Sequence, residues 1–171
     1  MRIAQLDLKA FGHFTDRRIA LDAGTDFHIA YGPNEAGKTT ISRALRAALF
    51  GVPERTTDSH LHANPNLRVG VVLECNGERL AAMRRKARKN SLIKYDPLTG
   101  EELGEAIPDE LLMAWMGGLT EGLYTSMFSL DHDELVAGGK ALSEGKGELG
   151  QSLFEAGAGL SSVRTLRERL A

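Results

Sequence analysis

The sequence has 171 residues, of which 42% are hydrophobic and 26% charged, the composition of a soluble protein long enough for one domain with its own core. Its one cysteine, Cys75, excludes an intramolecular disulfide, and no apolar run approaches the roughly 20 residues that cross a bilayer, so we expect a cytoplasmic protein with no membrane role. The net charge of -2 excludes a global attraction to nucleic acid, which only a local basic patch could then bind.

The first third of the chain combines strand-like and helix-like patterns. Residues 2–9 and 17–21 are short runs with strand periodicity on either side of a turn at Gly12. Residues 26–31 form a third apolar run that ends in Gly-Pro, and residues 39–50 then carry apolar side chains at helical spacing. This order predicts a strand, a glycine loop and a helix.

The middle section predicts an antiparallel meander. Residues 51–66 are rich in Thr, His, Asn and Asp and have no periodicity, which indicates a mobile loop. The alternation of residues 69–75 leads to Asn-Gly at 76–77, the favoured pair of a type I′ turn, after which Leu80 returns on the same face. Residues 92–95 add a further strand before an Asp-Pro-Leu-Thr-Gly turn.

The last third of the chain is helical in pattern. Residues 108–116 carry an apolar stripe that includes Trp115, which we expect in the core. Shorter helical patterns cover residues 120–127, 131–137 and 147–156. Residues 161–171 follow the three-then-four spacing of a coiled-coil seam, but one heptad is equally consistent with a terminal amphipathic helix.

The strongest motif matches G-x-x-x-x-G-K-[ST] completely and lies between a predicted strand and a predicted helix. The backbone N–H groups of such a loop, together with the positive end of a helix dipole, are donors for a triphosphate. Lys38 would neutralise the β and γ phosphates, Thr39 would supply one ligand to Mg²⁺, and Thr40 can donate to the α phosphate. We expect the nucleotide to contact Gly32, Pro33, Asn34, Glu35, Ala36, Gly37, Lys38, Thr39 and Thr40.

Hydrolysis would need a further carboxylate that holds Mg²⁺ or orients water. Glu74 follows an apolar run but precedes a hairpin turn, which favours an exposed strand residue. Asp131 fits helix capping together with Glu134 as well as a metal site, and both interpretations stay open. His60 and His62 lack a clear third ligand, so we interpret them as loop residues.

A basic stretch follows the first predicted hairpin of the meander. It could contact nucleic-acid phosphates without reading sequence. A solvated strand face, whose charges prevent edge-to-edge aggregation, is the interpretation that we favour. The residues are Arg84, Arg85, Lys86, Arg88, Lys89 and Lys94.

Four segments give the whole chain a resemblance to a known family. They are the opening residues 2–14 with Phe-Gly-His-Phe at their end, the phosphate loop, Met-Phe-Ser-Leu-Asp-His-Asp-Glu-Leu at residues 127–135, and Leu-Phe-Glu-Ala at residues 153–156. In this order and spacing, the chain resembles the N-terminal ATPase lobe of the YhaN-like proteins. These are relatives of SbcC, RecF and the SMC-type DNA repair ATPases within the ABC class.

The resemblance implies an α/β P-loop head lobe over residues 1–160. The lobe would have a mixed central sheet, an antiparallel β meander and C-terminal helices, and residues 161–171 would begin a truncated coiled coil. The nucleotide would be ATP with Mg²⁺, and the signature motif and Walker B acids would lie on a second lobe that this sequence lacks.

The resemblance also suggests roles for single residues. Asn34 would face the γ phosphate. The glutamine of the family's Q-loop would fall near Asp131 and His132, where His132 could act through its ring nitrogen, and an exposed loop histidine is the alternative. Residues 11–14 either approach the adenine or ribose or form a core turn.

The same resemblance implies partners. These are the missing C-terminal lobe, a second head in an ATP-dependent dimer, DNA, and an SbcD-like metallophosphoesterase nuclease. ATP would switch the heads between open and engaged states, and this half alone would not hydrolyse it. Two other functions stay open: a self-contained small P-loop kinase or NTPase completed by Asp131 or Glu74, and a non-hydrolysing interaction domain with ATP as a structural ligand.

Overall fold

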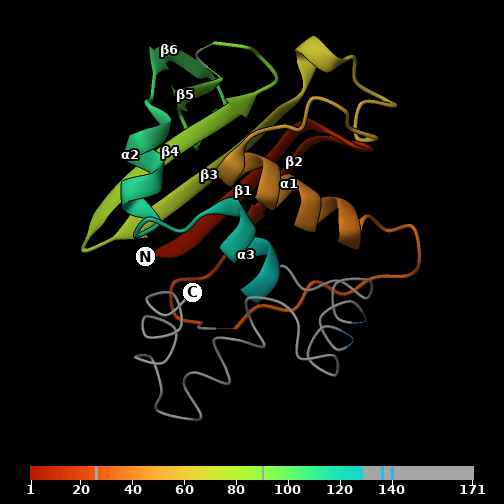
Figure 1. Cartoon of the computed structure of the whole chain (residues 1–171), viewed down its shortest axis with the longest axis horizontal. Helices are drawn as coiled ribbons and strands as arrows, with labels where there is room; N and C mark the ends of the chain where they lie inside the picture. The colour runs from red at the N-terminus through yellow and green to blue at the C-terminus, as the bar shows by residue number, and fades with distance from the viewer. Residues whose placement is uncertain (26, 90, 129–135, 137–139, 141–171) are drawn as a thin grey trace, which may run out of the picture. The chain divides into compact units, whose positions relative to one another are not determined.

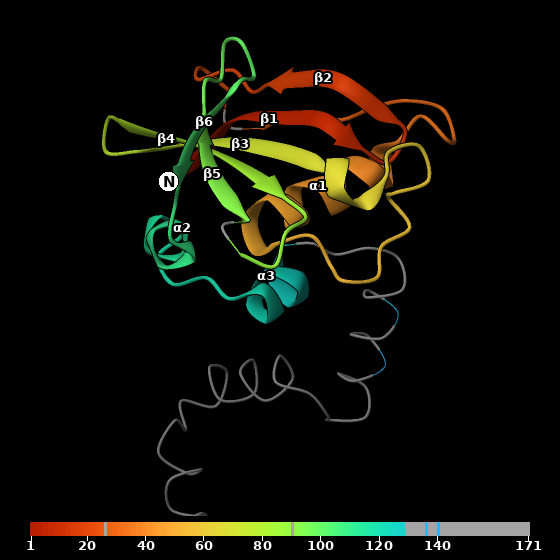
Figure 2. The same ribbon diagram turned by 90° about the horizontal axis from the view of Figure 1, so that it is seen from above.

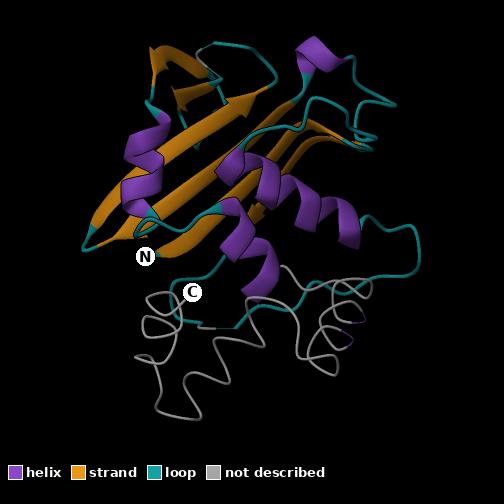
Figure 3. Ribbon diagram, in the orientation of Figure 1, coloured by secondary structure: helices purple, strands orange, loops and turns teal. Residues whose placement is uncertain are grey.

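The computed structural model describes residues 1–25, 27–89, 91–128, 136 and 140. The chain divides into two compact units, Met1–Glu121 and Gly122–Ala171. Six strands of the first unit form one sheet in the order β2-β1-β3-β4-β5-β6, and each neighbouring pair is antiparallel (Figures 1 and 3). The elements are β1 (Arg2–Phe11), β2 (Phe14–Ala20), α1 (Lys38–Phe50), η1 (Asn64–Asn66), β3 (Arg68–Cys75), β4 (Glu78–Arg85), β5 (Leu92–Tyr95), β6 (Glu102–Ala106), α2 (Asp109–Trp115) and α3 (Glu121–Met127).

The strand patterns of the opening and middle sections are confirmed. β1 and β2 are joined by a two-residue turn, so that Phe11 pairs with Phe14. The Asn-Gly pair at 76–77 adopts positive φ at both positions, as a type I′ turn requires, and sets Leu73 opposite Leu80. β5 and β6 continue the meander to the edge of the sheet.

Helix α1 packs against one face of the sheet, over β1, β3 and β4 (Figure 2). Its small residues Ala44, Ala47 and Ala48 are buried, which lets the helix backbone approach the strands closely. On β3 every residue from Val69 to Leu73 is buried, because α1 covers one face and a second apolar cluster lies on the other. The core therefore has two layers of side chains, one on each side of the sheet.

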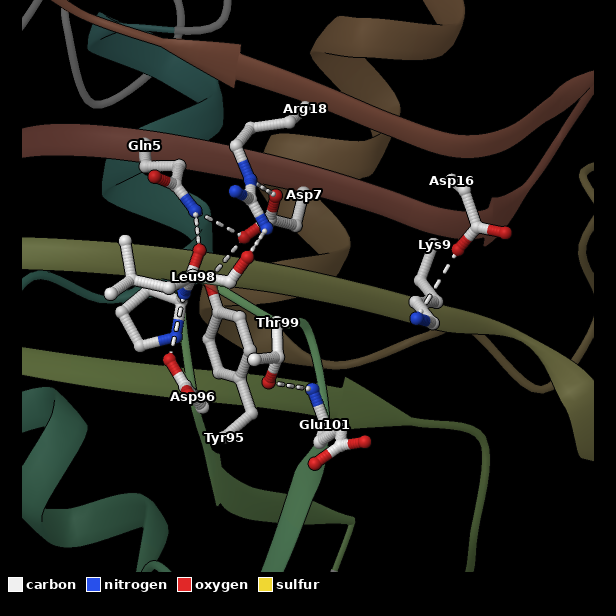
Figure 4. A network of polar contacts seen from close by, with 11 residues as sticks. Gln5, Asp7, Lys9, Asp16, Arg18, Tyr95, Asp96, Leu98, Thr99 and Glu101 are labelled. Carbon is white, nitrogen blue, oxygen red and sulfur yellow. Dashed lines mark hydrogen bonds and ion pairs between the residues drawn. The ribbon is translucent and has the colours of Figure 1, made fainter.

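The second face of the sheet is closed by a polar network around Asp7 (Figure 4). The Asp7 carboxylate accepts hydrogen bonds from Tyr95 Oη at 2.6 Å, Gln5 Nε2 at 2.6 Å and Arg18 Nε at 3.0 Å. Gln5 and Arg18 also donate to backbone carbonyls of the β5–β6 turn, at Pro97 and Leu98. A buried carboxylate is tolerated only when it is paired and hydrogen-bonded, and these contacts meet that condition for Asp7.

The prediction of a strand at residues 26–31 is wrong. Residues 27–31 form no strand, and Phe27, Ile29 and Tyr31 are 75%, 78% and 96% exposed. A strand forms only where a neighbour satisfies its backbone groups, and no strand pairs with this segment in the part of the chain that is described. The same residues would have supplied a parallel strand, so the mixed sheet that we expected is not found within the described residues.

The helical predictions are met as far as residue 127. α2 begins directly after Pro108 and is followed by Gly117 and Gly118, both at positive φ. Trp115 is half-buried, and Leu112 is the α2 residue that lies in the core, so our core assignment of Trp115 was only partly correct. The patterns at residues 131–137, 147–156 and 161–171 lie almost wholly outside the described residues. Among the helices that are described, none combines the length and apolarity needed to span a membrane.

We expect Tyr95→Phe to lower the free energy of unfolding by about 1–2 kcal/mol at pH 7, because Asp7 loses one buried donor. Burial raises the pKa of Tyr95, and its hydrogen bond to Asp7 raises it further. The folded protein therefore holds a proton that the unfolded chain releases near pH 10, and this contribution to stability is lost as the pH rises further. Urea unfolding from pH 7 to pH 11 should show a steeper alkaline loss in the wild type than in the variant, and equal slopes would contradict this role of Tyr95.

Candidate phosphate-binding site

The phosphate loop leads directly into α1, whose first helical residue is Lys38. Gly37, the N-cap, has φ of 95° and no side chain, so the N–H groups of the first turn of the helix have no side-chain cap. Such uncapped N–H groups and the positive end of the helix dipole favour an anion. The loop and the start of α1 are therefore a candidate anion-binding site.

Lys38 and Thr39 are exposed at the start of the helix. Lys38 Nζ donates to the carbonyl oxygens of Gly32 and Pro33, each at 2.7 Å. These contacts hold the ammonium group over the loop, where the β and γ phosphates of a bound nucleotide would lie. Thr39 presents an exposed hydroxyl of the kind that Mg²⁺ takes as one of its oxygen ligands.

The turn between β1 and β2 packs on this loop. The His13 and Phe14 rings lie with their centroids 4.0 Å apart, and a β-carbon added at Gly37 would be 2.5 Å from both His13 Nε2 and Phe14 Cζ. Phe11, by contrast, is 1% exposed and belongs to the core. Of the two interpretations of residues 11–14, a core turn describes Phe11, while His13 and Phe14 lie against the loop.

Residues 51–66, which we expected to be a mobile loop, are bonded to α1 and to the β1–β2 turn through Asp58. Arg43 Nε and Nη2 of α1 donate to the Asp58 carboxylate at 2.9 Å and 2.7 Å, and Thr56 Oγ1 donates to it at 3.3 Å. The backbone oxygen of Asp58 accepts from Gly12 N at 2.9 Å. Hydrogen bonding to Asp58 raises the pKa of Arg43, and Asp58 itself is buried.

Sequence reasoning missed Asp58 and Arg43. Arg43 occupies a polar position of an amphipathic helix, which resembles any solvated arginine, and Asp58 lies in a segment without periodicity. The only local signal was Thr56-x-Asp58, whose side chains commonly bond to the backbone two residues away, as Asp58 N does to Thr56 Oγ1 here.

Glu74, one of the two acids considered for hydrolysis, does not lie at the loop. Glu74 accepts from Arg2 at 2.7 Å and Arg79 at 3.0 Å, and it pairs with Arg2 at the opposite end of β1. That end of the ten-residue strand is about 30 Å from the Gly12 turn. Glu74 is therefore a surface strand residue, while Asp131 and His132 lie outside the described residues. Within the part of the chain that is described, no three His, Cys, Asp or Glu side chains could hold a metal together.

The basic stretch divides into structural and exposed residues. Arg84 is 2% exposed and donates to Asp109 at 2.6 Å and to the Leu49 carbonyl at the end of α1 at 3.2 Å. Lys86 donates to the Glu54 carbonyl and the Asn64 amide oxygen. Arg88 and Lys89 are exposed, and Arg88 helps to line a hollow of about 540 Å³. A contact between Arg84 and nucleic acid is excluded by its burial.

We expect Gly37→Ala to destabilise the fold by about 1–3 kcal/mol, because the new methyl group meets both rings and φ of 95° strains an alanine. Gly24→Ala is the matched control, since Gly24 lies in the same unit at an ordinary φ and has only ordinary van der Waals neighbours. Urea unfolding compares the two variants. Equal stability would show that the rings do not rest on Gly37.

The chain was compared with known proteins. The family model described as an AAA domain matches residues 1–171. The chain is 28% identical over 131 residues to the uncharacterized protein YhaN of Bacillus subtilis (strain 168), a match that spans 77% of this chain but only 13% of that protein. A solved structure described as "Structural biochemistry of ATP-driven dimerization and DNA stimulated activation of SMC ATPases" aligns with a TM-score of 0.45 and 14% identity, over 80% of this chain and 96% of the other.

The family model and the match to YhaN support an ATPase-type, nucleotide-binding function and confirm the resemblance to YhaN-like proteins. The family model covers the strands, the phosphate loop and every helix described above, so the chain belongs to the AAA domain family.

Proposed function

We propose that this chain binds Mg-ATP and forms the N-terminal half of an SMC-like ATPase head. One observation carries the proposal: an uncapped helix N-terminus whose glycine loop holds Lys38 Nζ over its own carbonyls. In this arrangement a phosphate group would replace two carbonyl oxygens as the partner of Lys38, gaining a charge-assisted hydrogen bond. The remaining donors are backbone N–H groups that already point outward from the first turn.

Three residues at the end of the loop have distinct parts in this proposal. Lys38 neutralises the β and γ phosphates, Thr39 holds Mg²⁺, and Thr40 donates to the α phosphate. When bound, Mg²⁺ would be held on the protein side by Thr39 and would offset the charge of the phosphates. His13 and Phe14 fix the position of Gly37, so the loop keeps its form before the nucleotide arrives.

The finer proposal is that a second lobe completes the head. Phe27, Ile29 and Tyr31 stand at alternate positions of the segment just before the phosphate loop, and each is at least 75% exposed. Apolar residues at alternate positions favour a strand with a covered face, and large exposed apolar groups mark interaction surfaces. The relative YhaN is far longer than the matched part, which leaves room for such a lobe. Residues 27–31 would then become a strand against it.

Engagement of two heads around ATP, an action on DNA and a nuclease partner follow from the resemblance to SbcC-like and SMC-like proteins. The catalytic acid and signature would come from the second lobe, so the half described here would bind ATP without turning it over. A self-contained small kinase or NTPase is the rival. Glu74, one of the two acids that could complete its metal site, is already held by Arg2 and Arg79.

We expect Mg-ATP to raise the thermal stability of this chain, by about 2.7 kcal/mol at a hundred times its dissociation constant. Lys38→Ala should show little stabilisation at the same ATP concentration, because the phosphates lose their point charge. Lys94→Ala is the control, since Lys94 is a partly exposed lysine that pairs with Glu105 on β6. Thermal unfolding with and without Mg-ATP measures this, and equal stabilisation of wild type and Lys38→Ala would overturn the nucleotide site.

The half-head proposal makes a separate prediction about turnover. Phosphate release from Mg-ATP by this chain should not exceed that of Lys38→Ala at any protein concentration, although binding is retained. Turnover that rises linearly with protein concentration would instead indicate a self-sufficient enzyme. Asp131 would then be the next residue to replace.

A further inference from the structure

Arg43 makes a two-pronged contact with Asp58 and a third contact with Thr40. Its Nε and Nη2 lie 2.9 Å and 2.7 Å from the two carboxylate oxygens, and Nη2 also lies 3.3 Å from Thr40 Oγ1. Asp58 is 3% exposed, whereas the Arg43 side chain is 45% exposed. Because a bidentate arginine–carboxylate pair has a fixed geometry, Asp58 determines where the guanidinium group lies.

The Thr40 side chain is held from two sides. Arg43 contacts its oxygen, and its methyl group fills the space beside Gly12, where an added β-carbon would lie 2.5 Å from Thr40 Cγ2. Gly12 is in turn fixed by its N–H, which donates to the backbone oxygen of Asp58 at 2.9 Å. Asp58 thus acts on Thr40 twice, through Arg43 and through the backbone of the β1–β2 turn.

The contact with Arg43 determines where the hydroxyl proton of Thr40 points. A threonine hydroxyl has one O–H donor and two acceptor lone pairs. The Arg43 guanidinium group can only donate, so it occupies a lone pair of Thr40 Oγ1 and leaves the O–H proton to point elsewhere. Thr40 stands three residues after Gly37, in the first turn of α1, and its side chain is buried there.

We infer that the Arg43–Asp58 pair positions the Thr40 hydroxyl so that it donates to the α phosphate of the bound nucleotide. The inference rests on the proposed function. Arg43 and Asp58 are positioning residues, since they act through Thr40 and do not touch the nucleotide. Asp58 also neutralises the Arg43 charge, which keeps the guanidinium group from moving to the phosphates itself.

The test measures the affinity of this chain for Mg-ADP and Mg-ATP by calorimetry. Thr40→Val removes the hydroxyl at nearly constant shape and should weaken both ligands about tenfold, the effect of a lost hydrogen bond to a charged group. Asp58→Asn keeps the side-chain shape but releases Arg43, and should weaken both by roughly three- to tenfold. Asp58→Glu, which restores the carboxylate, should recover part of that loss.

The double variant Thr40→Val/Asp58→Asn separates positioning from general destabilisation. If Asp58 acts through the hydroxyl, the double variant binds no more weakly than Thr40→Val alone. If the two losses multiply, the pair only supports the fold, and the inference is overturned. A larger loss for Asp58→Asn than for Thr40→Val would overturn it as well, because Arg43 would then act on the nucleotide by another route.

Two further variants keep this test decisive. Arg43→Lys keeps the positive charge beside Asp58 but loses the fork that reaches Thr40, so it should weaken binding even where Asp58→Asn fails to fold. Arg46 lies three residues after Arg43 on α1, is similarly exposed and pairs with Glu121. Arg46→Gln breaks that ion pair and should leave affinity unchanged. Lys38→Ala distinguishes the proposed nucleotide site from the positioning role of Arg43 and Asp58. If Lys38→Ala binds nucleotide normally, the proposed function fails. If Lys38→Ala loses binding while Arg43→Lys and Asp58→Asn keep normal affinity, only the positioning role is rejected.

Discussion

The packing of two aromatic rings on a residue without a side chain is the contact on which the site depends. His13 and Phe14 occupy the space where a β-carbon of Gly37 would lie, so the end of the first hairpin and the phosphate loop are fixed against each other. The hairpin is itself held by the long pairing of β1 with β3 in the middle of the sheet. The sheet therefore fixes the position of the phosphate loop, whose own backbone has few internal hydrogen bonds. A loop that is fixed before the anion arrives meets the requirement for preorganised anion binding.

Two buried carboxylates connect segments that are far apart in the sequence. Asp7 joins β1, β2 and the β5–β6 turn on one face, and Asp58 joins α1, the β1–β2 turn and the connection before η1. Each is paired with an arginine and bonded to neutral donors, the condition under which a buried charge is stable. The second carboxylate lies behind the phosphate loop, so the device that stabilises this corner of the fold also bears on the site.

The sequence was sufficient wherever local chemistry decides the structure. The Asn-Gly turn determined the register of β3 and β4, and the apolar spacing of residues 39–50 determined α1. Prediction failed where a distant partner decides: residues 27–31 have the composition of a strand, but no strand among the described residues pairs with them. It failed at Arg84 and Asp58 for the same reason, because a charged side chain is buried only if the fold brings its counter-charge to it.

Hydrogen exchange of the backbone N–H groups, with and without Mg-ATP, tests the central claim most directly, because the loop is proposed to bind through those groups. Protection should increase in residues 32–40, and also in residues 12–14 and 56–58, which the rings and Asp58 connect to the loop. Protection confined to other parts of the sheet, or no change in residues 32–40 at saturating Mg-ATP, would contradict the account.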